Sequence, residues 1–321
     1  MAETSSINSS AHRSFQDEFL ACWRVLPDKA LFFGLLAIWL ALFHFLGNST
    51  FGYVDSPSLF VWIQRICLRP DSDDSHVTLV PLIVLGLFWW KREVLLGVGK
   101  TTWWPALFLL MGAAVLHVLG HTIQQPKVSI LACWAGIYAL IALVWGYRFA
   151  AACFFPFVLL LFCIPISSFA DPITVPLRAI STKLAVITSH ALGIPVLQDG
   201  VQILDPKGRY SYEVAAACSG IRSLFTLVAL CTIYGWVTFT TGWKRLFMVG
   251  LAVPIALLGN LLRLVCIIIA AEAFGEKAGH FVHEWFGFLT FALAMVIVIA
   301  CGHWLRDSPA HSGPAPQPGL A

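Results

Sequence analysis

The chain has 321 residues, of which 59% are hydrophobic and only 12% are charged, and its formal net charge at pH 7 is +3. A soluble globular domain carries about 25% charged residues, so this chain is too apolar for water and the bilayer is its expected solvent. Its small, dispersed positive charge forms none of the basic patches that bind nucleic acid, which excludes nucleic acid as a partner.

Composition divides the chain into three segments. Residues 1–29 are polar and mixed in charge, without the apolar core of a cleavable signal, and we expect a cytoplasmic N-terminal segment there. Residues 306–321 form a Pro/Gly-rich tail that is typical of disorder. Residues 30–305 lie between them and hold all the long apolar stretches, which predicts one multi-pass membrane domain.

Eight apolar stretches follow one another in this central segment. A helix needs about 17–25 apolar residues to cross the hydrocarbon core. The second stretch is the shortest, but its Trp89-Trp90 pair followed by Lys91-Arg92 is typical of an interfacial belt that meets the cytoplasm. The sequence therefore predicts an all-α, polytopic membrane helix bundle with about eight transmembrane helices, at residues 30–46, 77–90, 102–119, 128–146, 150–166, 214–234, 246–272 and 285–305.

The distribution of Lys and Arg predicts the orientation of the bundle. With the N-terminus inside, the short inner loops hold six basic residues in 25 positions, whereas the outer loops hold eight in 97. Because cytoplasmic loops are enriched in Lys and Arg, we expect both termini in the cytoplasm. The outer loops are then residues 47–76, 120–127, 167–213 and 273–284.

The longest of these outer segments is predicted to be partly structured. Leu177, Ile180, Leu184 and Ile187 recur at helical spacing with polar residues between them, which indicates a helix lying in the membrane interface. Residues 201–214 then read as two short strands around a turn at Asp205-Pro206-Lys207-Gly208, a hairpin that could guide an extended peptide.

Nine cysteines are present, mostly inside apolar runs where cysteine packs as a small hydrophobic residue. No CxxC pair or Cys/His spacing of a zinc site occurs, and the odd number gives no disulfide framework. We therefore expect neither a metal nor a cofactor.

Polar residues gather where three of the predicted spans approach the outer face. Cys218 lies about one turn inside the sixth span, with Arg222 four residues later on the same helical face. Arg263 lies 18 residues beyond the inner end of the seventh span at Arg245, roughly 27 Å along a helix and near the outer boundary. A charged side chain at such a position must face protein, water or a ligand.

Further polar residues accompany this set at the same depth. Asn260 precedes Arg263 by three residues on the same side of the seventh span, and His280 and His283 lie in the loop before the eighth. A cysteine reacts as a thiolate, a histidine can transfer protons and an arginine can stabilise an oxyanion. Cys218, Arg263 and His283 therefore suit acyl transfer, with Arg222, Asn260 and His280 in support.

Each residue also has a structural interpretation when taken singly. Cys218 could pack like the other cysteines, and Arg263 could extend its charge to the interface. Arg222 could pair with an acidic residue, and His283 could belong to an aromatic belt. His280 is an alternative to His283 for the same role.

Three sequence blocks carry a resemblance to a known family. EVAAACSGIRSL (213–224), GNLLRL (259–264) and HEWFGF (283–288) resemble, in order and spacing, the signature blocks of the exosortase/archaeosortase family. The resemblance covers roughly residues 150–305. It departs from the family at Ala216, where members often have Glu, and this difference suggests a subfamily with its own signal.

The resemblance implies a membrane-embedded cysteine transpeptidase of the bacterial inner membrane, on the exosortase branch. Its expected substrates are exported proteins with a C-terminal sorting signal, which consists of a short motif such as Pro-Glu-Pro, a hydrophobic helix and a basic tail. Cys218 then corresponds to the nucleophile, Arg263 to the catalytic arginine and His283 to the catalytic histidine. The acceptor amine, on a membrane lipid or a surface polymer, is not defined.

Two other functions remain open at this point. A transporter or channel could bind an anionic substrate through Arg222 and Arg263, and it should tolerate loss of Cys218. A membrane scaffold for polysaccharide export should tolerate loss of all three residues.

Overall fold

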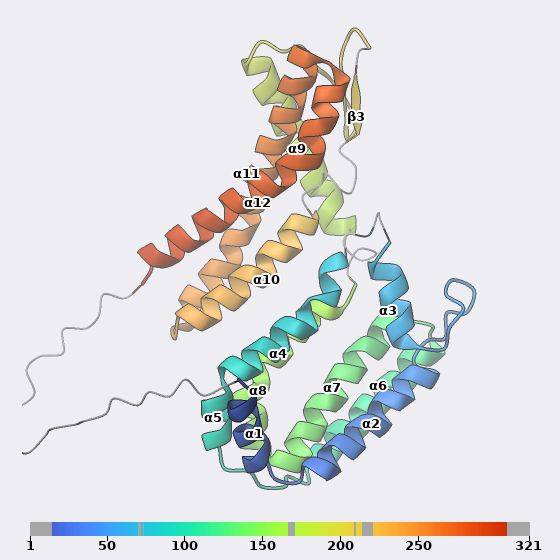
Figure 1. The fold of residues 1–321 in the computed structure, drawn as a ribbon. Coiled ribbons are helices and arrows are strands. Elements are labelled where there is room, and N and C mark those ends of the chain that lie inside the picture. The colour runs from blue at the N-terminus through green and yellow to red at the C-terminus, as the bar shows by residue number, and fades with distance from the viewer. Residues whose placement is uncertain are drawn as a thin grey trace, which may run out of the picture. The chain divides into compact units, whose positions relative to one another are not determined.

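The computed structural model describes residues 15–69, 72, 74–165, 171–208, 210–213 and 221–306 (Figure 1). The chain divides into two compact units, Met1–Pro165 and Ile166–Ala321. Helices dominate the described part of both units, so the predicted all-α membrane bundle is confirmed.

The first unit is built around one central helix, α7, against which α2, α6 and α8 pack. Buried residues occupy most of its length, among them Ile130 and Leu140. The helices of this unit are α1 (Phe15–Val25), α2 (Lys29–Leu46), α3 (Leu59–Cys67), α4 (Val80–Trp90), α5 (Arg92–Gly97), α6 (Ala106–Thr122), α7 (Pro126–Trp145) and α8 (Tyr147–Leu159), with the 3-10 turns η1 (Ser75–Thr78) and η2 (Leu160–Cys163).

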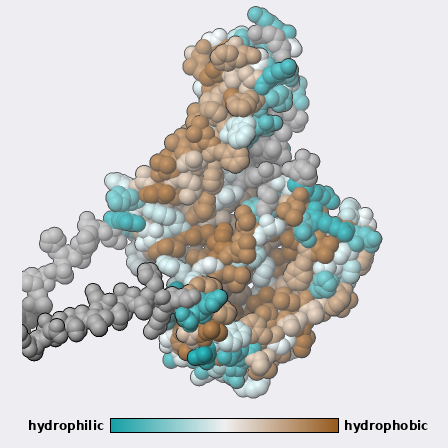
Figure 2. Space-filling model, in the orientation of Figure 1, coloured by the Kyte–Doolittle hydropathy of each residue, from teal (hydrophilic) through white to brown (hydrophobic). Residues whose placement is uncertain are grey.

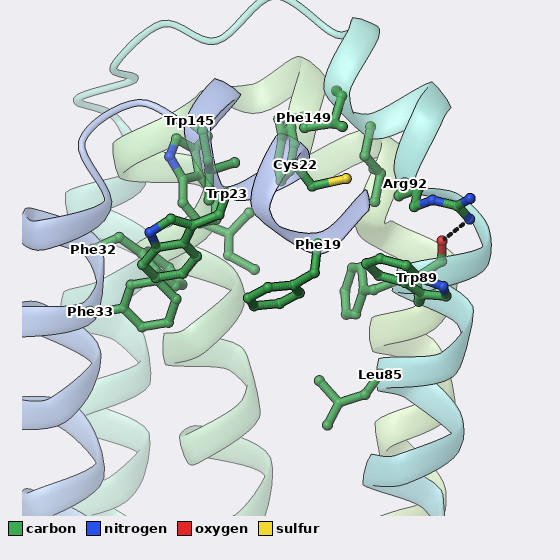
Figure 3. Close-up of a pocket in the computed structure, with 15 residues that line it drawn as sticks. Phe19, Cys22, Trp23, Phe32, Phe33, Leu85, Trp89, Arg92, Trp145 and Phe149 are labelled. Atoms are coloured by element: carbon green, nitrogen blue, oxygen red, sulfur yellow. Dashed lines mark hydrogen bonds between the residues drawn. The ribbon is translucent and has the colours of Figure 1, made fainter. Parts of the chain in front are cut away.

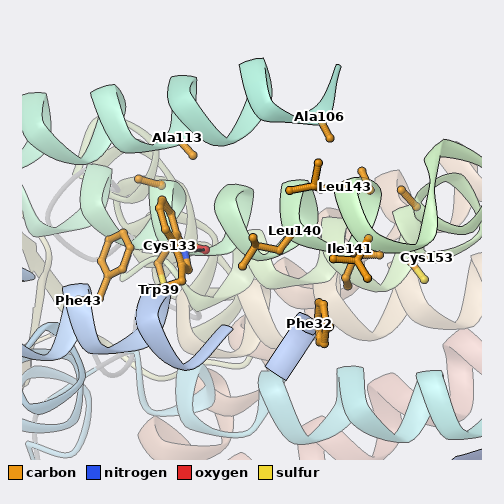
Figure 4. Packing of buried hydrophobic residues seen from close by; sticks show 14 of the residues in the cluster. Phe32, Trp39, Phe43, Ala106, Ala113, Cys133, Leu140, Ile141, Leu143 and Cys153 are labelled. Carbon is orange, nitrogen blue, oxygen red and sulfur yellow. Dashed lines mark hydrogen bonds between the residues drawn. The ribbon is translucent and has the colours of Figure 1, made fainter. Parts of the chain in front are cut away.

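A tryptophan side chain fixes the contact between α2 and α7. Trp39 is buried, and its indole Nε1 donates a hydrogen bond to the Cys133 carbonyl at 3.0 Å (Figure 4). Its ring lies directly against the backbone of Gly136, where a Cβ atom would stand 2.7 Å from Nε1 and closer still to two ring carbons. The glycine is therefore required for this close approach.

In the second unit, α10, α11 and α12 form the scaffold of the candidate site. α11 packs against α9, α10 and α12 (Figure 1). Leu227, Met248, Ala252 and Val298 form the centre of the core between the last three helices. The elements are α9 (Asp171–Ala191), β1 (Leu197–Asp199), β2 (Gln202–Leu204), β3 (Ser211–Glu213), α10 (Ile221–Thr238), α11 (Gly242–Phe274) and α12 (Glu276–Trp304).

The predicted apolar stretches overlap eight helical segments of the described chain, although residue 166 of the fifth stretch and residues 214–220 of the sixth lie outside the described residues. Four helices, α2, α7, α11 and α12, are long and apolar enough to cross a membrane. Four shorter apolar segments match the remaining stretches: His76–Trp90, Ala106–Thr122, Tyr147–Cys163 and Ser223–Thr238. Large apolar side chains lie exposed along α11 and α12, including Leu246, Leu258 and Phe288 (Figure 2). Such surfaces are costly in water and suit a bilayer.

The predicted outer loop at 273–284 is wrong. α11 continues to Phe274 and α12 begins at Glu276, so that Gly275 alone joins them, at φ 88°. Glycine adopts this left-handed conformation without a steric penalty. Hydropathy marks only the apolar part of a helix, and α12 begins nine residues before the predicted start of the span at residue 285.

The helix predicted between the fifth and sixth spans is present as α9. It ends at Ala191, and Gly193 follows at a φ of 79°. The Gly193 N–H donates to the His190 carbonyl and the Ile194 N–H to the Ser189 carbonyl, both at 2.9 Å. This pair of hydrogen bonds is the Schellman motif that closes many helices at a glycine. The position of α9 in the membrane interface stays a prediction.

A small antiparallel sheet follows α9. The predicted hairpin is present as β2 and β3, and the unpredicted strand β1 pairs with β2, giving the order β1-β2-β3. β1 is three residues long and exposed throughout, too short to show the alternation of polar and apolar residues that marks a strand. Ile203 of β2 is fully buried and packs in one cluster with Leu264 and Ile268 of α11. The sheet is thereby fixed to α11 beside Arg263.

Candidate functional site

The candidate site is centred on a hydrogen bond between α11 and α12. Arg263 projects from α11, and its Nη2 donates to the His283 carbonyl of α12 at 2.6 Å. Hydrogen bonds from a charged donor are shorter and about twice as strong as neutral ones. The second and third sequence blocks are therefore joined in space through the Arg263 side chain.

A glycine one turn beyond His283 makes room for the guanidinium. A Cβ atom at Gly287 would stand 3.7 Å from Arg263 Cζ and 3.8 Å from Nη1, which is ordinary van der Waals contact. The guanidinium thus lies over this position of α12. A side chain larger than that of alanine at 287 would occupy the same space as the Arg263 head group.

A small cavity of about 50 Å³ lies between α10, α11 and α12. Its polar lining comes from all three helices: Ser223, Asn260, Arg263 and Thr290. Asn260 is only 5% exposed, and within the described part of the chain its Nδ2 has no hydrogen-bond partner. A polar space of this size can hold ordered water, because a water molecule needs about 10–15 Å³ of accessible volume and two to four polar partners.

The two candidate histidines lie three residues apart on α12, not in a loop. His280 is exposed, whereas His283 is half-buried and carries the carbonyl that Arg263 binds. Their spacing places both on neighbouring positions of one helical face. The contact with Arg263 favours His283 as the residue nearer the site.

The family comparison covers these residues. The family model of the transmembrane exosortases matches residues 62–300, about three quarters of the chain. This chain belongs to the transmembrane exosortase family. Neither the curated proteins nor the solved structures gave a match. The matched region includes all three blocks and extends well before residue 150, where the resemblance noted in the sequence begins.

The side chains of two residues of the predicted exosortase site are not described. Cys218 lies outside the described residues, and Arg222 lies in the first turn of α10 with a side chain that is not described. The next residue, Ser223, lines the cavity. The structure therefore brings Asn260, Arg263 and His283 together with the beginning of α10, and the catalytic roles stay predictions.

Other site residues of this exosortase were missed by sequence reasoning. Gly287 and Thr290 follow His283 by four and seven residues, a spacing that places them on the same face of α12. That periodicity could have revealed them once His283 was placed on a helix. Among the described residues, no group of three His, Cys, Asp or Glu side chains is arranged to hold a metal ion.

Proposed function

We propose that this transmembrane exosortase is a cysteine transpeptidase that cleaves a C-terminal sorting signal from exported proteins and transfers them to an acceptor amine. The observation that carries the proposal is the Arg263–His283 hydrogen bond, because it joins two of the three blocks that bear the proposed catalytic residues. Family membership supports the same reaction.

The proposed chemistry needs three roles. The Cys218 thiolate attacks the scissile peptide carbonyl and forms a tetrahedral oxyanion, which the Arg263 guanidinium stabilises. His283 donates a proton to the leaving amine as the carbon–nitrogen bond breaks, and a thioester to Cys218 remains. An acceptor amine then attacks the thioester, loses a proton to His283 and releases the thiolate.

The substrate's hydrophobic helix would enter laterally among the spans, so that its motif reaches the outer face. In this scheme residues 30–305 form one membrane domain in a bacterial inner membrane, with both termini in the cytoplasm. Arg222, Asn260 and His280 support the site rather than react. The acceptor amine belongs to a lipid or a surface polymer.

Cysteine-dependent trimming of a substrate tests the proposal. A reporter that ends in a motif, a hydrophobic helix and a basic tail is expressed with the wild type, Cys218→Ala or Cys266→Ala. The mass of its C-terminal peptide is then measured by mass spectrometry. We expect trimming by the wild type and Cys266→Ala but not by Cys218→Ala. Equal trimming by all three would exclude Cys218 as the nucleophile.

The proposed role of Arg263 has its own test. Removal of one oxyanion donor lowers kcat by about 10²–10³-fold in other enzymes, and we expect a loss of that order for Arg263→Ala in the same reporter assay. Gly287→Ala is the matched control, because its added methyl group only touches the guanidinium. Full activity of Arg263→Ala would contradict the role, whereas absence of trimming by the wild type as well would favour the transporter-like function, tested by anion uptake.

A further inference from the structure

The first unit contains an apolar cavity that the proposed reaction does not use. Its volume is about 420 Å³, and its walls come from α1, α2, α4, α5, α7 and α8 (Figure 3). Large aromatic side chains form much of the lining, including Phe19, Trp23, Phe33, Trp89 and Trp145. The size lies within the range of about 300–1,000 Å³ that is usual for ligand sites.

α1 covers the cavity without filling it: its Phe19 and Trp23 rings contact Trp89 and Phe33 of the walls, with ring centroids 6.4 and 5.4 Å apart. α1 is an amphipathic helix with no buried residue, yet Phe19, Cys22 and Trp23 line the space beneath it. Phe33 of α2 and Leu85 of α4 face each other across the gap and remain 43% and 63% exposed (Figure 3). The apolar walls are thus open toward the surroundings of the bundle.

The position of the cavity corresponds to the interface of a membrane. The N-terminal end of α2, the C-terminal ends of α4 and α7 and the start of α8 all meet here. Tryptophan and basic side chains, which concentrate at membrane–water interfaces, gather at this end of the unit: Trp23, Trp89, Trp90, Trp103, Trp104, Trp145, Lys29, Lys91, Arg92, Lys100 and Arg148.

Among the described residues, Arg92 is the one charged residue that lines the cavity. Its Nη2 donates to Glu18 Oε2 at 2.8 Å and its Nη1 to the Trp89 carbonyl at 3.2 Å, while the guanidinium stacks over the Trp89 ring. The Arg92 side chain keeps 26% of its surface exposed. A guanidinium has five N–H donors, so an anionic oxygen can bind it beside Glu18.

We propose that this cavity binds one acyl chain of a membrane phospholipid, whose phosphate contacts Arg92 at the rim. The combination of an apolar pocket and an interfacial arginine fits an amphiphile with an anionic head group. A transmembrane helix fits poorly, because one helical turn about 10 Å wide and 5.4 Å long already fills about 420 Å³. The proposal is independent of the transpeptidase activity.

The first test fills the cavity with a larger side chain on α1. Cys22→Trp places an indole in the cavity, whereas Leu20→Trp adds the same group to a side of α1 that does not line it. Native mass spectrometry of the full chain, purified in mild detergent, counts the bound phospholipid. We expect occupancy to fall by about fivefold or more in Cys22→Trp and to stay near wild type in Leu20→Trp.

Substitution of the two partners of the ion pair should change the affinity for the lipid head group in opposite directions. Arg92→Gln removes the cation, and the loss of a charged hydrogen bond should weaken phosphatidylglycerol binding by about tenfold or more. Glu18→Gln removes the competing anion and should strengthen binding. Equal affinity of both variants would overturn the assignment of Arg92 to the phosphate.

A photoreactive lipid gives a measurement that does not depend on any variant. Phosphatidylglycerol with a diazirine in its acyl chain is activated in nanodiscs, and the labelled peptides are mapped. We expect adducts concentrated on the cavity walls, at Cys22, Phe33 and Leu85, and competed by unlabelled phospholipid. Adducts spread evenly over the outer helix faces would mean only surrounding bilayer lipid and would overturn the proposal.

Discussion

Substitution of Gly136 by alanine should break the contact between α2 and α7. The new methyl group would stand 2.7 Å from Trp39 Nε1 and closer to two carbons of the same ring. Trp39 is buried and cannot swing into open space. Either the indole must turn, which breaks its 3.0 Å hydrogen bond to the Cys133 carbonyl, or the two helices must separate.

The expected cost follows from these contacts. Overpacking a core costs about 1–3 kcal/mol, and the broken hydrogen bond adds about 0.5–1.5 kcal/mol. Alanine also gains about 1 kcal/mol over glycine inside a helix. Gly34→Ala on α2 has the same propensity gain with open space around the new methyl group. The free energies of unfolding of the two variants should therefore differ by about 1.5–4.5 kcal/mol.

Both variants can be compared in one detergent by equilibrium unfolding, with tryptophan fluorescence as the signal. Gly136→Ala should unfold at lower denaturant concentration than wild type, and Gly34→Ala at the same or a higher one. Adding Trp39→Leu should reduce the effect of Gly136→Ala, because the clashing ring is gone. Equal stability of Gly136→Ala and Gly34→Ala would refute the packing argument.

Three further predictions concern other contacts. Gly302→Ala should destabilise the second unit by about 1–3 kcal/mol in thermal unfolding, because its Cβ would stand 2.6 Å from Tyr234 Cζ. Lys100→Met should lower the melting temperature, because Nζ donates to three carbonyls at the end of α5. The free energy of unfolding should fall by about 1.5–3 kcal/mol. Burial, and then Asp74, raise the pKa of the Cys67 thiol to about 12. The unfolded thiol loses its proton near pH 8.5, so stability should fall above that pH by about 1.4 kcal/mol per unit, and less in Cys67→Ala.

Most of the fold could be predicted from the sequence, because the lengths of the apolar stretches determine where the helices lie. The eight stretches match apolar helices, and the turn residues of the hairpin identify β2 and β3. β1 was missed because Leu197–Asp199 is short and exposed on every residue. The start of α12 was missed for a related reason: the polar residues from Glu276 onward lower the local hydropathy without ending the helix.

The candidate site was predicted less completely. The sequence selected Arg263 and His283, and the structure places the Arg263 guanidinium against the His283 backbone. It gave no sign that Gly287 would accommodate that guanidinium, because a glycine in an apolar span has many structural roles. Cys218 lies outside the described residues, so its place beside Arg263 stays a prediction.

The one-residue turn at Gly275 explains why these particular residues meet. Arg263 precedes Gly275 by twelve positions and Gly287 follows it by twelve. In two antiparallel helices the backbones of Arg263 and Gly287 therefore lie at the same level, about 18 Å from the turn. His283 lies one turn nearer to Gly275, about 6 Å away along the axis. That distance is within reach of an extended arginine side chain, which therefore passes over Gly287 and ends at the His283 carbonyl. A flexible loop of twelve residues would leave this register undetermined, whereas a single glycine at φ 88° fixes it.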